Sequence, residues 1–188
     1  HWIREYGVDG YRLDYANGPS LDFWTDFRAR VRTENAACFL FGEIVDSPGT
    51  LRNYVGHLDG CLDFFASETL RKAYGWKAIT PAEAERMLKL HNAYYPADFI
   101  LPTFIDNHDM DRFLVIAQGD KDALRRAAAA QFRLPAPPVI FYGTEVGLNQ
   151  RFPVHGHGLH MSREPMLWGD QQDRELLAVY KRLIAQRA

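Results

Sequence analysis

Short apolar runs that end in Asp, Glu or Gly alternate along this chain with longer stretches of helical periodicity. This alternation is typical of repeated βα units around a parallel sheet. We expect five strands, at residues 10–14, 38–43, 60–64, 100–106 and 139–142. The same pattern predicts helices at residues 21–33, 67–74, 82–94, 120–133 and 173–186.

Local signals mark where some of these elements begin or end. Thr80, Pro81 and Glu83 supply a hydroxyl N-cap, a proline in the first turn and a carboxylate near the positive end of a helix. Residues 143–169 are rich in Gly, His and Pro and show no clear period, which predicts a long loop. Long ordered loops are often functional.

The chain length limits the architecture. An eight-stranded (β/α) barrel needs about 250 residues, or roughly 30 for each unit, and this chain has 188. We therefore expect residues 1–188 to be one partial β/α-barrel domain of the (β/α)8 TIM-barrel type, with about five βα units and no C-terminal β-sandwich domain. The open sheet edges of such a barrel predict self-association.

Composition narrows the class of protein further. With 47% hydrophobic and 24% charged residues, the chain is typical of a soluble, well-packed domain. The formal charge of −2 gives no reason to expect a nucleic-acid or membrane partner, and no apolar stretch reaches the roughly 18 residues of a membrane span. The first residues look like mid-domain sequence, so the compartment is not assigned. Cys38 and Cys61 are expected to be buried thiols, with a bridge between them as the alternative.

Three acidic residues stand at the ends of predicted strands: Asp14, Glu43 and Asp109. The carboxyl ends of parallel strands form the active-site rim of a barrel, so we expect the three to meet there. Neighbouring strands lie about 4.8 Å apart, which suits the roughly 5 to 5.5 Å between the two carboxyl groups of a retaining glycosidase. Asp14 and Glu43 are one βα unit apart and are the candidates for that pair.

The surroundings of each acid predict its role. Arg12 lies on the same strand face as Asp14 and would favour its ionised form, so Asp14 is the expected nucleophile. Glu43 follows an apolar run that can desolvate a proton donor, so it is the expected general acid and base. Asp109 is placed to bind a sugar hydroxyl in the transition state, with His108 as a neutral donor beside it.

Three sequence segments resemble conserved segments of the α-amylase family. They are Gly-Tyr-Arg-Leu-Asp-Tyr-Ala-Asn at residues 10–17, Phe-Gly-Glu-Ile at residues 41–44 and Phe-Ile-Asp-Asn-His-Asp at residues 104–109, in the order of the family's second to fourth segments. Residues 139–147 and 162–168 are similar to the family's last barrel strand and the loop after it. The resemblance implies that the chain covers strands four to eight of the barrel.

The resemblance also implies an activity. It is a retaining double displacement on the α-1,4 or α-1,6 bonds of maltooligosaccharides or starch-type glucans, without a cofactor. Asp14, Glu43 and Asp109 would be catalytic, and the substrate-binding residues would be Arg12, His108, Tyr15 and Arg112. Asn17-Gly18 replaces the Lys-His pair of many starch amylases, which favours an enzyme acting on oligosaccharides and argues against bound calcium. The family's first conserved segment has no counterpart in this chain.

Other polar and aromatic residues have simpler interpretations. Asp63 and Asp106 are expected to be structural, and the Gly-flanked His155, His157 and His160 are not expected to bind a metal. Trp168 and Tyr15 are candidates for stacking on sugars. The aromatic residues in strand runs are expected in the core, namely Phe39, Phe41, Phe64, Phe65 and Phe104.

Two other functions remain open from the sequence. A glycosyltransferase would use the same displacement with a sugar acceptor in place of water, and product analysis with an added acceptor distinguishes it. A catalytically inactive fragment, or a binding and assembly module, would keep the carboxylates without turnover. We expect that behaviour of the isolated chain, because the first three βα units are absent from it.

Overall fold

The computed structural model describes residues 1–187, which fall into two compact units. The first unit comprises residues 1–65 and 90–102, and the second comprises residues 66–89 and the chain from Thr103 onward. Each unit has its own cluster of buried apolar side chains.

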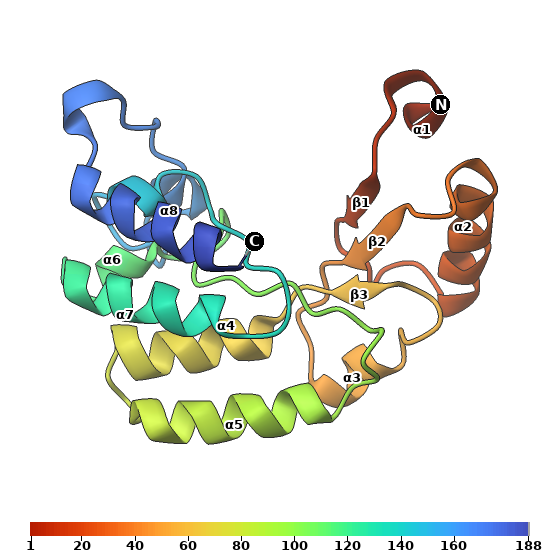
Figure 1. The fold of residues 1–188 in the computed structure, drawn as a ribbon, viewed down its shortest axis with the longest axis horizontal. Helices are drawn as coiled ribbons and strands as arrows, with labels where there is room; N and C mark the ends of the chain where they lie inside the picture. The colour runs from red at the N-terminus through yellow and green to blue at the C-terminus, as the bar shows by residue number, and fades with distance from the viewer. Residues whose placement is uncertain (188) are drawn as a thin grey trace. The chain divides into compact units, whose positions relative to one another are not determined.

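The first unit contains a three-stranded parallel sheet in the order β1-β2-β3 (Figure 1). Its strands are β1 (Gly10–Leu13), β2 (Phe39–Gly42) and β3 (Gly60–Cys61), so the first three predicted strands are present in shortened form. Helices α1 (Trp2–Tyr6), α2 (Leu21–Glu34) and α3 (Pro48–Arg52) connect or precede them. The short α3 was not predicted from the pattern.

Helix α2 shows how the sequence fixes the connection after β1. Its N-cap is Ser20, whose hydroxyl accepts a hydrogen bond from the Phe23 N–H at 3.3 Å. Trp24 and Val31, two turns apart, are its buried residues and belong to the same core cluster as Leu40 of β2. The Trp24 indole also donates to the Ala16 carbonyl at 2.7 Å. The packing of α2 therefore fixes the segment that follows Asp14.

Two glycines let strands approach more closely than any other residue would allow. A Cβ atom on Gly10 would lie 2.3 Å from the Phe39 carbonyl oxygen, and one on Gly60 would lie 1.9 Å from the Ile100 carbonyl oxygen. Because a side chain at either position would collide with backbone, glycine is required there.

The prediction of regular strands at residues 100–106 and 139–142 is wrong. Residues 100–106 and 139–142 show only isolated parallel bridges, Gly60 with Ile100 and Thr103 with Pro138. Single ladder-type bonds remain, such as Ile100 N–H to Asp59 O at 2.9 Å and Val139 N–H to Thr103 O at 2.6 Å. Prolines at positions 102, 137 and 138 have no N–H to donate, which interrupts the ladder and explains the difference.

The regular elements of the second unit are helices, and all of them except α6 lie close to their predicted positions. Thr80 and Glu83 form a reciprocal capping box, with Thr80 N–H to Glu83 Oε2 at 2.7 Å and Glu83 N–H to Thr80 Oγ1 at 3.2 Å. None of the helices within residues 1–187 combines the length and apolar character that crossing a membrane requires. The elements are α4 (Phe64–Leu70), the π-helix η1 (Arg71–Gly75), α5 (Pro81–Ala93), α6 (Phe113–Ile116), α7 (Lys121–Phe132) and α8 (Arg174–Arg187).

The predicted long loop at residues 143–169 is present. It carries the 3₁₀ turns η2 (Thr144–Val146) and η3 (Leu159–Ser162), and a further turn, η4 (Gly169–Gln171), starts at its end. Helix α6 went unpredicted because its four residues are all apolar and have no period.

Buried charges lie within the core of the second unit. The Asp106 carboxylate is 2% exposed and accepts hydrogen bonds from Phe113 N–H at 2.9 Å and from the Thr144 hydroxyl at 3.0 Å. Burial raises the pKa of Asp106, while these two bonds and the charges of Arg112 and Arg71 act in the opposite direction. Asp106 is thus structural, as its sequence context suggested.

Removing this carboxylate is expected to destabilise the chain. Asp106→Ala would leave the Phe113 N–H and the Thr144 hydroxyl without their buried acceptor, which costs about 1–3 kcal/mol for each group in the free energy of unfolding. It would also remove a negative charge that acts on the buried guanidinium groups of Arg71 and Arg112. Chemical denaturation measures this loss. Asp122→Ala is the matched control, since its side chain is 70% exposed beside Arg125 and should change stability by about 0.5 kcal/mol or less. Equal effects of the two variants would contradict the buried-charge explanation.

Several smaller predictions concern residues of the first unit. Cys38 and Cys61 are buried free thiols, as expected, and burial raises the pKa of Cys61 to about 12. Asp63 is fully buried with His91 Nε2 3.0 Å from its Oδ1, and the Phe65 ring stacks on that imidazole at 4.4 Å. These groups serve the packing of the unit.

Candidate active site

Asp14 and Glu43 leave adjacent strands at the same level. Leu13 and Gly42, the last residues of β1 and β2, are paired in the parallel register. Two backbone bonds continue the pairing beyond the strands, Glu43 N–H to Leu13 O at 2.8 Å and Ala16 N–H to Glu43 O at 2.9 Å. The predicted neighbouring carboxylates therefore stand side by side at the carboxyl edge of the sheet.

Arg12 connects the two carboxylates. Its Nη1 forms an ion pair with Asp14 Oδ1, and its Nη2 lies 2.7 Å from Glu43 Oε1. The sequence predicted the contact with Asp14 but not the one with Glu43. The carboxylates differ in exposure: the side chain of Asp14 is 77% exposed and that of Glu43 is 14% exposed. One planar guanidinium thus fixes an open carboxylate beside a covered one.

The residue after Asp14 has an unusual backbone. Tyr15 has φ of 47°, a left-handed conformation that is uncommon outside glycine, and its N–H lies 3.5 Å from Glu43 Oε2. Its side chain is 68% exposed, and its ring packs against Gly18, where a Cβ would come within 2.9 Å of the ring carbons. The ring of Tyr15 is therefore available to solvent, as a stacking residue requires.

Asp109 lies in the second unit with partners of its own. Its Oδ2 is 3.1 Å from His108 Nε2, and its Oδ1 is 2.8 Å from Arg163 Nη2. Its backbone N–H donates to Asn107 Oδ1 at 2.8 Å. The predicted neighbours His108 and Asp109 do contact each other. Sequence reasoning gave no role to Arg163, although it belongs to the segment 162–168 singled out as a family-like loop.

Arg112 is 1% exposed and bonds to carbonyl oxygens of the loop. Its Nε donates to Ser162 O and its Nη1 donates to Tyr142 O, each at 2.9 Å. The guanidinium also lies over the Phe141 ring, 4.3 Å from its centroid. Its Nη2 is buried and has no hydrogen-bond partner within the described residues. Arg112 therefore orders the loop at residues 143–169 through these bonds. Among the described residues, its Nη2 remains an unused donor.

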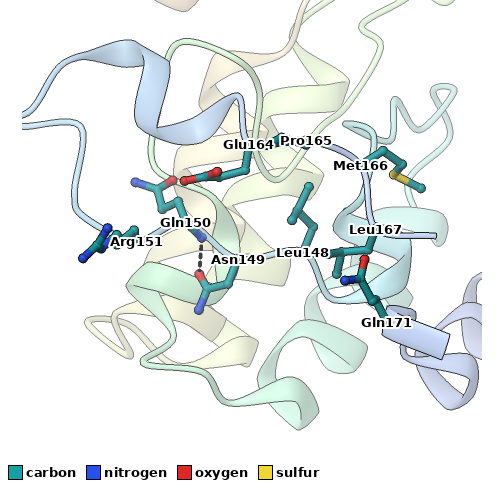
Figure 2. Close-up of a pocket in the computed structure, with 9 residues that line it drawn as sticks. All are labelled: Leu148, Asn149, Gln150, Arg151, Glu164, Pro165, Met166, Leu167 and Gln171. Atoms are coloured by element: carbon teal, nitrogen blue, oxygen red, sulfur yellow. Dashed lines mark hydrogen bonds between the residues drawn. The ribbon is translucent and has the colours of Figure 1, made fainter. Parts of the chain in front are cut away.

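The loop walls also enclose a surface pocket of about 440 Å³. Its lining includes Leu148, Gln150, Glu164 and Leu167, whose side chains are drawn in Figure 2. Gln150 holds one wall, since its side chain accepts from Arg112 N–H at 2.7 Å and donates to Asp111 Oδ1 at 2.6 Å. The loop around the pocket is thus tied to the buried part of the unit.

The remaining candidates are placed as follows. Trp168 is 72% exposed, whereas Phe104 is buried, and Phe39 and Phe41 are half-buried and stacked on each other. His157 stacks on Phe152 at 4.8 Å. Across residues 1–187, no cluster of three or more His, Cys, Asp and Glu side chains is arranged to hold a metal ion.

Comparison with known proteins gives consistent matches along the chain. A family model described as the catalytic domain of alpha amylase matches residues 1–177. Alpha-amylase 2 of Dictyoglomus thermophilum is 39% identical over 188 residues, covering 98% of this chain and 33% of that protein. Cyclomaltodextrinase of a Bacillus species is 34% identical over 202 residues, covering 100% of this chain and 33% of that protein. The chain thus spans about a third of the length of these curated relatives.

Solved structures give the same result for the fold. Cyclic alpha-maltosyl-(1→6)-maltose hydrolase from Arthrobacter globiformis, in complex with maltose, aligns with a TM-score of 0.88 at 26% identity. The alignment covers 98% of this chain and 41% of that one. The fold is therefore α/β of the TIM-barrel type, in agreement with the resemblance drawn from the sequence segments.

Proposed function

The chain belongs to the alpha-amylase catalytic domain family, and on this premise we propose that the protein containing it is a retaining glycoside hydrolase. Its substrates are maltooligosaccharides with α-1,4 or α-1,6 glucosidic bonds. The observation that carries the proposal is the pair of Asp14 and Glu43 at the ends of paired strands, both bonded to Arg12. Adjacent carboxylates of different exposure suit a nucleophile and a general acid.

The proposed mechanism gives each carboxylate one role. Asp14, the more exposed, attacks the anomeric carbon and forms a covalent glycosyl–enzyme intermediate. Glu43, the more covered, protonates the departing oxygen and then removes a proton from the attacking water. Asp109 binds a sugar hydroxyl and stabilises the oxocarbenium-like transition state. No cofactor takes part.

Four further residues bind or support the substrate in this proposal. Arg12 holds Asp14 and Glu43 in place, and His108 donates to the same ring as Asp109. Tyr15 offers an exposed ring for stacking on the apolar face of a sugar. Arg112, buried as it is, acts on the substrate through the loop that it orders.

We also propose that residues 1–188 form one partial catalytic β/α-barrel domain, corresponding to strands four to eight of the family's barrel. Strands β1, β2 and β3 would be the fourth, fifth and sixth strands, and the ladder segments around Thr103 and Val139 would be the seventh and eighth. Supporting this register, the family model matches almost the full chain.

The stereochemistry of the first product tests the proposed function. Two inversions at the anomeric carbon restore the α-configuration, so the protein that contains this chain is expected to release α-anomeric maltooligosaccharides. Proton NMR during the first minutes of the reaction, before mutarotation, measures the anomer. Release of the β-anomer would contradict a double displacement and the role of Asp14 as nucleophile.

Product analysis of the same reaction, run with and without an added acceptor sugar, separates hydrolysis from the alternative functions. With an added acceptor sugar, a hydrolase releases mainly reducing sugar, whereas a glycosyltransferase forms longer glycosides. A protein that only binds or assembles shows no turnover that depends on Asp14. The proposal expects net hydrolysis, lost on replacing Asp14.

A further inference from the structure

Arg163 makes two directed bonds to neighbouring residues of the proposed site. Its Nη2 donates to Asp109 Oδ1 at 2.8 Å, and its Nε donates to the His108 carbonyl at 3.1 Å. His108 Nε2 lies 3.1 Å from Asp109 Oδ2. Both oxygens of the Asp109 carboxylate therefore have a partner, which defines the orientation of this group.

The backbone on either side of Arg163 is anchored. Ser162, 0% exposed, donates from its hydroxyl to the His108 carbonyl at 2.9 Å, and its own carbonyl accepts from Arg112 Nε at 2.9 Å. The Glu164 carbonyl accepts from the Tyr142 hydroxyl at 2.7 Å. Glu164 and Pro165, the next two residues, line the pocket (Figure 2). The backbone on both sides of Arg163 is therefore held by hydrogen bonds, which fixes the position from which Arg163 reaches Asp109.

We propose that Arg163 is a positioning residue for Asp109, an inference that rests on the proposed function. The side chain of Arg163 is 49% exposed and that of Asp109 is 40% exposed, and an ion pair between such exposed groups contributes little to the stability of the fold. The consequence of losing the pair is instead geometric. A carboxylate freed to rotate away from the sugar hydroxyl stabilises the transition state less, and small misplacements of this kind cost up to about 100-fold in rate.

The test uses Arg163→Ala and Arg163→Lys in the protein that contains this chain, with maltotriose as substrate. Arg163→Ala is expected to lower kcat about 10- to 100-fold, with KM changed about threefold or less and an unchanged Tm. Lysine can place one charge near Asp109 but lacks the planar group that bonds Asp109 Oδ1 and the His108 carbonyl together, so Arg163→Lys should recover part of the loss. Arg174→Ala is the matched control, because Arg174 bonds Asp170 at 2.8 Å with a 75% exposed side chain.

The outcomes separate this proposal from the proposed function. Wild-type turnover with unchanged kcat in Arg163→Ala would overturn the role of Arg163 alone. So would a loss of kcat accompanied by a lower Tm, or a lysine variant no better than alanine. Absence of wild-type turnover would overturn the proposed function and this inference together.

Discussion

Asp14→Asn is expected to lower kcat for maltooligosaccharide cleavage by at least about 10⁴-fold in the protein that contains this chain. The amide cannot form the glycosyl ester, so the first chemical step is lost. The replacement has nearly the same shape and keeps an oxygen that can accept from Arg12, so the fold and substrate binding should remain. Steady-state kinetics and binding calorimetry with maltotriose measure the two quantities separately.

The control for this variant is Asp26→Asn. Asp26 is an exposed acid on α2, and its neutralisation changes the total charge by the same amount. We expect wild-type kinetics from it. If Asp14→Asn retained more than about a tenth of the wild-type kcat, Asp14 could not be the nucleophile.

Glu43→Gln is expected to lower kcat by an amount that depends on the leaving group of the substrate. With maltooligosaccharides the leaving group is a sugar alkoxide that needs a proton, so kcat should fall about 10²- to 10⁴-fold. With a nitrophenyl maltoside the departing nitrophenolate needs no proton, but hydrolysis of the intermediate still lacks its base. Stopped-flow absorbance should therefore show a burst of nitrophenol followed by slow turnover.

Glu68→Gln provides the comparison. Glu68 pairs with Lys72 at 3.2 Å with a half-exposed side chain, and its replacement should leave both substrates unaffected. Equal losses for the two substrates in Glu43→Gln, without a burst, would assign Glu43 a binding role instead of proton transfer.

Local sequence patterns determine the elements of the first unit that lead into the site. The strands that carry Asp14 and Glu43, and the helix after Ser20, follow from local apolar runs and capping residues, and all were predicted. The alternation of apolar and polar residues cannot report missing backbone donors, which is why the segments near Pro102 and Pro138 were expected to be regular strands.

The acidic residues of the candidate site could be predicted from the sequence, whereas most contacts of the arginines that bond them could not. Asp14, Glu43 and Asp109 stand in short motifs, and a motif identifies its own residues. The contacts of Arg12 with Glu43 and of Arg163 with Asp109 join residues 31 and 54 positions apart. No local pattern reports contacts of that range. Arg112 illustrates the same limit, because its motif indicates a substrate contact while the structure places it among loop carbonyls.

The central claim is that Asp14 becomes covalently bonded to the sugar. A fluorinated maltosyl fluoride that forms the intermediate quickly and releases it slowly should trap that species. Peptide mapping by mass spectrometry after a short incubation is expected to find the added sugar on Asp14, and to find none in Asp14→Asn. A label on another carboxylate, or turnover of this reagent with no labelled peptide, would contradict the account.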